Sequence, residues 1–187
     1  VDSLNFFLTN LFIAIATGGT VVVAQYIGKG DKQRAAKTIS QAVTSSVLIA
    51  VVIMIVINLF PNQTLNLLFG AAEQKILDNA YIYLIGSSIS YPFYAVYQAS
   101  AGALRGLGDT KASMVMSVIM NCTYLVGNII LIQVLKLGVL GVSIAMVCSR
   151  ILVSILALVY LLVKRSDLGI KFKHFFMFDG KLQKSIL

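Results

Sequence analysis

The run from Thr38 to Phe60 reads TISQAVTSSVLIAVVIMIVINLF and contains no charged side chain. An α-helix rises about 1.5 Å per residue, so roughly 20 apolar residues cross the ~30 Å hydrocarbon core of a bilayer. This run is long enough to do so, and further uncharged runs lie on both sides of it. We therefore expect five membrane-spanning helices, at about 4–27, 38–60, 79–103, 112–135 and 138–163.

The uncharged tract continues past Phe60 through Pro61-Asn62-Gln63, so the second span could also be two elements. Proline cannot continue a helix without losing a hydrogen bond, and proline next to asparagine is typical of a turn. We expect the helix to stop near Phe60 and residues 61–78 to form an interfacial connection.

The composition indicates an all-α membrane protein, a polytopic transmembrane helix bundle. Hydrophobic residues make up 58% of the 187 residues, charged residues make up 12%, and the mean hydropathy is +0.89. A water-soluble domain of this size could not cover such a core with polar surface. A transmembrane β-barrel is excluded because its strands alternate over about 10 residues. Cys122 and Cys148 lie inside spans and are expected to be small buried residues, neither a disulfide pair nor metal ligands.

The basic residues fall on alternate connections and predict the orientation of the bundle. Six lie on connections 28–37 and 104–111 and six on the C-terminal tail, whereas the opposite side has only Lys75 and Lys136. Because Lys and Arg are enriched on the cytoplasmic side, we expect both connections and the tail to be cytoplasmic in the cell membrane. The first span then runs inward, so we expect a further span before it. Topology thus explains the net charge of +8, and we expect no nucleic-acid partner.

A short motif, G-x-G-D, occurs at Gly28–Asp31 and again at Gly106–Asp109. Glycine adopts the left-handed conformation that ends a helix, and aspartate caps the free N–H groups of the next helix. The motif therefore predicts two helical hairpins of similar design, as in transporters built from repeats. A phosphate-binding loop is disfavoured, because no strand precedes the motif and no complete dinucleotide or P-loop signature is present.

Three groups of polar side chains are candidates for a substrate-binding cavity, because a polar group is costly where a helix faces lipid. Each group shares one helix face. Tyrosine offers an aromatic face for an organic cation, and asparagine and glutamine offer amide groups. Interhelical hydrogen bonds that hold the bundle together are the alternative role for every one of them. The groups are Asn5 with Thr9; Tyr91, Tyr94 and Gln98; and Asn121, Tyr124 and Asn128.

Two spans contain residues that could bend them. Pro92 removes a backbone hydrogen bond in the middle of the third span and is predicted to kink it, either as a hinge or as a static packing kink. Gly18 and Gly19 belong to a patch of small residues with Ala14 and Ala16. Such a patch permits close helix packing, and a bending point for alternating access is the other possible role.

Arg150 is the only charge between Lys136 and Lys164, and it lies well inside a predicted span. It could extend to the interface or pair with a buried carboxylate elsewhere, and we favour a structural role. No Asp or Glu lies within any predicted span; Asp2 stands at the outer edge of the first. Proton-coupled exchangers usually need a membrane-embedded carboxylate, so these spans alone are not expected to couple transport.

Three stretches resemble markers of the multidrug and toxic compound extrusion (MATE) transporters. Residues 18–31, GGTVVVAQYIGKGD, are similar to the second span and first cytoplasmic loop of that family. Residues 91–93, YPF, followed by GALRGLGDTK at 102–111, look like the fourth span and its loop. Residues 137–145, LGVLGVSIA, followed by Ser149-Arg150, resemble the sixth span. The order and spacing agree with the family, and the resemblance covers about 1–165.

The resemblance implies five spans of a six-helix MATE-type lobe, the N-terminal one, with residues 166–187 as a basic link toward a second lobe. It implies a secondary active antiporter that exports small, often cationic organic compounds in exchange for Na⁺ or H⁺, without other cofactors or a metal site. The alternative is a lipid-linked oligosaccharide or polysaccharide flippase of the related fold, which more often has several charged residues in its cavity. An enzyme or a channel is disfavoured, because neither catalytic nor filter motifs are present.

Some branches of the family carry an Asp on the first span of this lobe, with Asn, Asp or Thr partners on later spans. Tyr124, Asn128 and Met146 occupy those partner positions here, and only Asn128 keeps an amide or carboxylate oxygen. The resemblance therefore implies an ion site in the expected preceding span or in the second lobe, or a departure from that branch.

Overall fold

The computed structural model describes residues 2–69 and 74–164, and the predicted tail at 166–187 lies outside them. In the described part of the chain every regular element is a helix, as the sequence predicts. The helices are α1 (Asp2–Gly28), α2 (Lys32–Leu59), α3 (Pro61–Phe69), α4 (Gln74–Gly106), α5 (Thr110–Asn128), the π-helix η1 (Ile129–Val134) and α6 (Val139–Lys164).

Five long helices overlap the five predicted spans. By length and composition, four of them are apolar enough to cross a membrane: α1, α2, α5 continued through η1, and α6. The fifth, α4, is 33 residues long and carries several serines and tyrosines. It contacts α1, α2, α5 and α6, so many of its polar side chains meet neighbouring helices. The more polar helix is therefore the central one.

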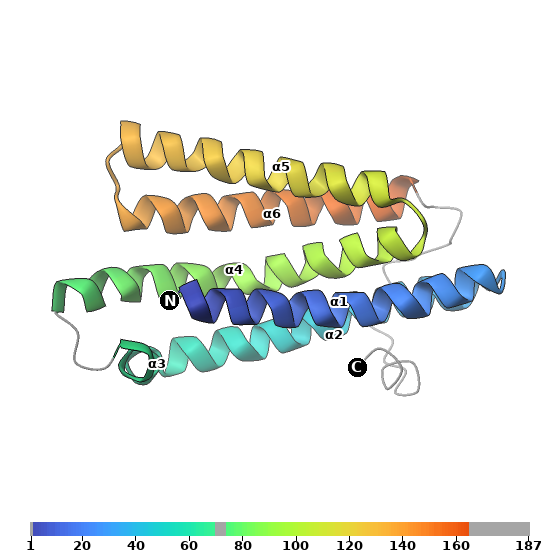
Figure 1. The fold of residues 1–187 in the computed structure, drawn as a ribbon, viewed down its shortest axis with the longest axis horizontal. Coiled ribbons are helices and arrows are strands. Elements are labelled where there is room, and N and C mark those ends of the chain that lie inside the picture. Colours follow the sequence, from blue (N-terminus) through green and yellow to red (C-terminus); the bar gives the residue numbers. More distant parts are fainter. Residues whose placement is uncertain (1, 70–73, 165–187) are drawn as a thin grey trace.

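Figure 1 shows α4 between two helix pairs, with α1 and α2 on one side and α5 and α6 on the other. The α1–α2 and α4–α5 connections lie at the same end of the bundle, and the α5–α6 connection lies at the opposite end. This arrangement agrees with the alternation of basic and less basic connections along the sequence.

Several helix boundaries differ from the predicted ones. Helix α2 begins at Lys32, earlier than the predicted start at 38, because Asp31 caps it there. The predicted interfacial connection contains the short helix α3, which starts at Pro61. Proline is favoured at a first helical position, where its missing N–H removes no hydrogen bond. Helix α4 starts at Gln74, also before its predicted start at 79, and runs through Pro92 without interruption.

The two G-x-G-D motifs form the same turn, as the sequence predicts. Gly30 and Gly108 have φ angles of 75° and 79°. Asp31 Oδ1 accepts a hydrogen bond from the Arg34 N–H at 2.9 Å, and Asp109 Oδ1 accepts one from the Ala112 N–H at 3.3 Å. Left-handed glycine followed by a capping aspartate thus reverses the chain at the same end of both hairpins.

Small residues bring α1 close to α4 and α2. A Cβ atom added at Gly102 would lie 2.7 Å from the Ala16 carbonyl oxygen, and one at Gly19 would lie 3.1 Å from the Ala42 Cβ. Thr20 Oγ1 lies 2.9 Å from the carbonyl oxygen of Gly102, which ties the two backbones together. Of the predicted patch, Ala16 and Gly19 are buried in these contacts, whereas Ala14 is exposed and Gly18 is half-buried. Close packing is therefore the role that the contacts support.

The expectation that Cys122 and Cys148 are buried is wrong, because both thiols are free and exposed. The buried residues of α5 are Ala112, Ser113 and Met116, all within its first two turns. The rest of α5, including Cys122, is only loosely covered by neighbouring helices. A position inside a span therefore does not imply burial among helices.

Candidate functional site

A cavity of about 300 Å³ lies between α4, α5 and α6. Three helices contribute to it, and its walls mix aromatic rings, methionines, hydroxyls, an amide and one guanidinium group. The lining residues are Tyr83 and Tyr94 from α4, Met120, Asn121 and Tyr124 from α5, and Met146, Ser149 and Arg150 from α6. Such a mixture of adaptable apolar groups and a few convergent polar groups is typical of a small-molecule site.

Arg150 is the charged group of this cavity. Its guanidinium carbon lies 4.5 Å from the centre of the Tyr94 ring, within the range of a cation–π contact. Its Nη1 donates a 2.6 Å hydrogen bond to Ser90 Oγ. These contacts to α4 hold the guanidinium inside the bundle. The sequence had suggested instead that Arg150 extends to the interface or pairs with a carboxylate.

Asn5 and Tyr91 lie in the interface between α1 and α4. Tyr91 is completely buried, and its hydroxyl donates a 2.6 Å hydrogen bond to Asn5 Oδ1. Asn5 Nδ2 donates a 3.2 Å hydrogen bond to Ser87 Oγ. Ser90 Oγ donates to the Ser87 carbonyl oxygen at 2.6 Å, so polar contacts run from α1 through α4 to Arg150. Asn5 and Tyr91 therefore tie α1 to α4, the helix that contacts Arg150.

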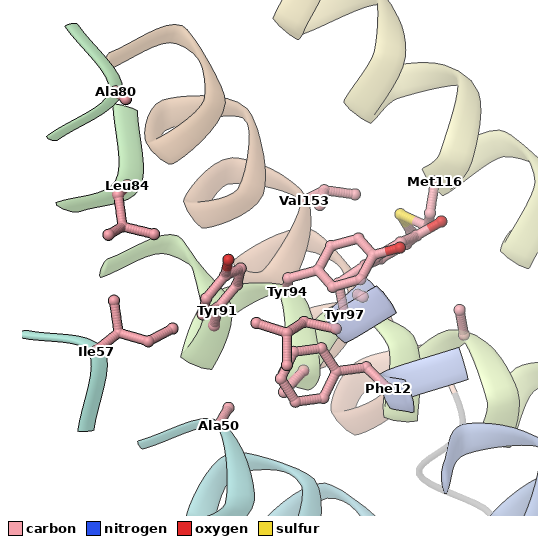
Figure 2. Close-up of a cluster of buried hydrophobic side chains, with 14 of the residues drawn as sticks. Phe12, Ala50, Ile57, Ala80, Leu84, Tyr91, Tyr94, Tyr97, Met116 and Val153 are labelled. Carbon is pink, nitrogen blue, oxygen red and sulfur yellow. The ribbon is translucent and has the colours of Figure 1, made fainter. Parts of the chain in front are cut away.

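Figure 2 shows this region of the core, where Tyr91, Tyr94 and Tyr97 of α4 gather beside Phe12 of α1. The Phe12 ring centre lies 6.1 Å from that of Tyr91 and 6.3 Å from that of Tyr94. Aromatic contacts of this kind stabilise buried rings and restrict their orientation. The Tyr94 ring thus contacts both Phe12 and Arg150.

Gln98 lies at a second cavity of about 560 Å³, between α1, α4 and α5. Its Nε2 donates a 2.5 Å hydrogen bond to the Tyr94 hydroxyl, which connects it to the first cavity. Arg105 also lines the second cavity, and its Nη1 donates a 3.2 Å hydrogen bond to Ser113 Oγ. The predicted group Tyr91, Tyr94 and Gln98 is therefore divided among a helix interface and two cavities.

The α5 group is also divided. Asn121 and Tyr124 line the first cavity, and Asn121 Nδ2 donates to the Ser117 carbonyl oxygen at 2.9 Å. Asn128 lies at the end of α5, next to the π-helix η1. Its Oδ1 is buried and lacks a hydrogen-bond partner among the described residues. Thr9, the last predicted residue, donates to the Phe6 carbonyl oxygen of its own helix at 2.9 Å.

Sequence reasoning missed Tyr83, Met120 and Ser149 as cavity-lining residues, and it missed Ser90 as the partner of Arg150. A signal was present, because Tyr83, Ser90 and Tyr94 share one face of α4 at spacings of seven and four. Serines within a span look like packing residues, however, and only the arrangement of α4 against α6 reveals their partner.

A third cavity, of about 430 Å³, lies between α4 and α6 and is lined mainly by isoleucine, leucine and valine side chains. It includes Cys148, and its Ser143 hydroxyl lies 3.2 Å from the Val139 carbonyl oxygen of the same helix. Its walls lack the convergent polar groups that recognise a polar ligand. Within the described residues, no cluster of three or more His, Cys, Asp or Glu side chains could hold a metal ion.

Comparison with known proteins places this chain among membrane transporters. The MatE family model matches residues 1–130. The probable multidrug resistance protein NorM of Thermotoga maritima is 29% identical over 163 residues, which cover 87% of this chain and 34% of that protein. The probable low-salt glycan biosynthesis flippase Agl15 of Haloferax volcanii is 29% identical over 168 residues, 89% of this chain and 34% of that protein.

A solved structure has the same fold. It is the outward-facing conformation of a multidrug resistance MATE family transporter of the MOP superfamily, with a TM-score of 0.86 and 24% sequence identity. The match covers 98% of this chain and 41% of that one. The chain thus spans little more than a third of the length of the curated relatives that it matches. With a helical bundle of apolar spans and a family match over most of its length, this chain belongs to the MatE family of multi-pass membrane transporters.

Proposed function

We propose that the chain forms most of one lobe, the N-terminal one, of a secondary active multidrug exporter. The complete protein would move small organic compounds out across the cell membrane in exchange for Na⁺ or H⁺, and a second lobe would complete the transport path. The observation that carries the proposal is the cavity between α4, α5 and α6, which Tyr94, Asn121 and Tyr124 line together. Family membership and the relative named as a multidrug resistance protein support it.

The cavity lining fits ligands of varied shape. Methionine side chains adapt to different outlines, because they are unbranched and polarizable. Tyr94 and Tyr124 provide aromatic surface and hydroxyl groups, and Asn121 provides an amide. Few fixed contacts and adaptable walls suit a protein that carries many compounds.

The proposed orientation places connections 28–37 and 104–111 in the cytoplasm. Both connections are basic, and both lie at the same end of the bundle (Figure 1). At this end Arg34 Nε lies 3.3 Å from Asp31 Oδ2, so the two residues form an ion pair at the capped turn. Basic turns at one end are typical of the cytoplasmic face.

A lipid-linked glycan flippase is the second candidate. Arg150 favours it, because a lipid-linked sugar carries phosphate groups that a half-buried guanidinium would bind. The relative named as a probable glycan biosynthesis flippase also supports this alternative. Arg150 is the only charged residue of the cavity lining, which favours the exporter.

The test is dye uptake into inside-out vesicles that carry the complete gene product. A fluorescent organic cation and, in a parallel assay, a fluorescent organic anion are added, and Na⁺ and H⁺ gradients are imposed separately. Uptake that follows one gradient and stops when that gradient is dissipated is the expected result and identifies the coupling ion. Well-folded protein that moves no dye under either gradient would contradict the exporter and favour the flippase.

A further inference from the structure

We propose that the cavity between α4, α5 and α6 binds the anionic group of the transported molecule, a carboxylate, sulfonate or phosphate, with Arg150 as its main ligand. This inference rests on the proposed function in one respect, that the cavity lies on the transport path. The inference concerns the charge of the substrate. The family resemblance implied substrates that are often cationic, whereas the cavity points to an anionic group.

The charge of the cavity is the first argument. Among the described residues that line it, Arg150 carries the only formal charge, and that charge is positive. The group is half-buried in the interior of a membrane bundle, and its charged or titratable neighbours among the described residues are tyrosines. A charge without a counter-ion is costly in such a place. An anion that enters the cavity offsets this cost, whereas an organic cation increases it.

The geometry of Arg150 is the second argument. A guanidinium group has five N–H donors in one plane, and Ser90 accepts a hydrogen bond from one of its nitrogens. The contact with the Tyr94 ring and the hydrogen bond to Ser90 restrict the guanidinium group at the wall of the cavity that Arg150 lines. A planar fork held in place matches the two oxygens of a carboxylate or two oxygens of a phosphate.

The position of Tyr94 is the third argument. The face of a tyrosine ring is the group that would attract an organic cation. In this cavity Arg150 already occupies a position 4.5 Å from that ring centre. A second cation would compete with Arg150 for the ring and be repelled by it. From the sequence, Tyr94 was expected to attract a cationic substrate. In the structure its ring contacts Arg150, a cationic group of the protein, instead.

Other lining groups complete an anion site. Tyr124 and Asn121 bring a hydroxyl and an amide from α5. Hydroxyls and amides can donate to an anion without adding charge. Met120 and Met146 offer apolar contact for the rest of the molecule. A compound with an aromatic or apolar body and one acidic group fits this set.

The experiment compares two xanthene dyes that differ in charge. The complete protein is purified in detergent, and its binding of anionic fluorescein and cationic rhodamine 6G is measured by fluorescence anisotropy. We expect fluorescein to bind more tightly than rhodamine 6G and to be displaced by benzoate or benzenesulfonate. Arg150→Gln should weaken fluorescein binding by at least about tenfold, the effect of a lost charge-assisted hydrogen bond. Binding of rhodamine 6G should stay the same or become tighter.

Arg34→Gln is the matched control. Arg34 also lies over a tyrosine ring, 6.0 Å from the centre of Tyr26, but it is exposed at the start of α2. Its replacement removes the same charge outside the cavity and should leave the binding of both dyes unchanged. An equal loss of fluorescein binding in the two variants would overturn the proposal, as would unchanged binding in Arg150→Gln.

A second variant covers the case in which Arg150→Gln does not fold. Asn121→Asp changes one exposed side chain of the same cavity by a single atom and introduces a carboxylate. We expect the new carboxylate to form an ion pair with the Arg150 guanidinium. Fluorescein should then bind about tenfold more weakly and rhodamine 6G more tightly. Unchanged preference between the dyes would contradict an anion site.

The anion could belong to a free compound or to a lipid headgroup. Repeating the titration in nanodiscs of phosphatidylcholine, with and without phosphatidylglycerol, separates the two. Loss of Arg150-dependent fluorescein binding in the anionic discs identifies a lipid phosphate as the occupant, and equal binding in both identifies a soluble anion. These binding measurements need no ion gradient, so they are independent of the transport assay. Gradient-driven transport without an effect of Arg150→Gln would refute only the anion site. An Arg150-dependent anion site without gradient-driven transport would refute only the exporter.

Discussion

The amide of Gln98 donates a 2.5 Å hydrogen bond to the hydroxyl of Tyr94, and this bond joins two cavities of the bundle. Tyr94 lines the cavity that contains Arg150, and Gln98 lines the larger one beside α1. The two residues lie one helical turn apart on α4, so one helix face serves both spaces. One side-chain pair therefore borders both cavities.

Tyr94→Ala should weaken substrate binding by the complete protein more than Gln98→Ala. The first change removes an aromatic wall and the ring under Arg150, whereas the second removes one hydrogen bond. We expect about tenfold or more for Tyr94→Ala and a few-fold for Gln98→Ala. Tyr94→Phe, which keeps the ring, should resemble Gln98→Ala. Affinities from dye titration test this order, and unchanged affinity in both alanine variants would disprove the role of this face.

Asn5→Leu should destabilise the bundle by about 1–2 kcal/mol, because it leaves the buried Tyr91 hydroxyl without its acceptor. The measurement is the thermal unfolding temperature of the purified protein in detergent. Asn10→Leu is the control, since Asn10 is exposed and its Nδ2 donates only to the Phe6 carbonyl oxygen of its own helix. Equal stability of the two variants would show that the Asn5 network contributes little.

Gly102→Ala should destabilise the contact between α1 and α4. Its Cβ would lie 2.7 Å from the Ala16 carbonyl oxygen, a distance that forces two backbones apart and costs about 1–3 kcal/mol. Gly28→Ala is the matched variant, because no atom lies within 4 Å of the Cβ that it adds. Gel filtration and thermal unfolding should distinguish the two, and a Gly102→Ala protein as stable as Gly28→Ala would contradict the close packing.

Accessibility of single cysteines should reveal the orientation of the bundle. In a complete protein whose own cysteines, Cys122 and Cys148 among them, are all changed to serine, Lys29→Cys should react with a membrane-impermeant maleimide in inside-out vesicles. Leu137→Cys, on the α5–α6 connection, should react in right-side-out vesicles instead. This result follows from the basic turns on one side of the bundle. The reverse pattern would invert the proposed topology.

Asn128→Leu tests the buried oxygen at the end of α5. Because Asn128 Oδ1 lacks a partner among the described residues, its removal should not lower the unfolding temperature in the absence of Na⁺. If this oxygen is an ion ligand, the variant should lose the Na⁺ or H⁺ dependence of dye transport in vesicles. A variant that unfolds but keeps its ion dependence would assign Asn128 to packing alone.

Much of this architecture could be predicted from the sequence, because its causes are local. Long uncharged runs require helices in a membrane, since every backbone polar group must be satisfied within the segment. Gly30 and Gly108 with their following aspartates end one helix and start the next through atoms only a few residues apart. The basic turns could be predicted for the same reason, because the positions of Lys and Arg in the sequence are sufficient to identify them.

The site depended on contacts that no local pattern contains. Tyr91, Tyr94 and Gln98 share a face of α4, yet the structure directs one to Asn5, one to Arg150 and one to a second cavity. Ser90 becomes the partner of Arg150 because α4 crosses α6 at that level, 60 residues apart in the sequence. The sequence determined which segments are helices and which faces are polar. Only the packing of α4 against its neighbours decided which residue each polar side chain contacts. The position of a residue on a helix sets the direction of its side chain, but not which residue of another helix lies next to it.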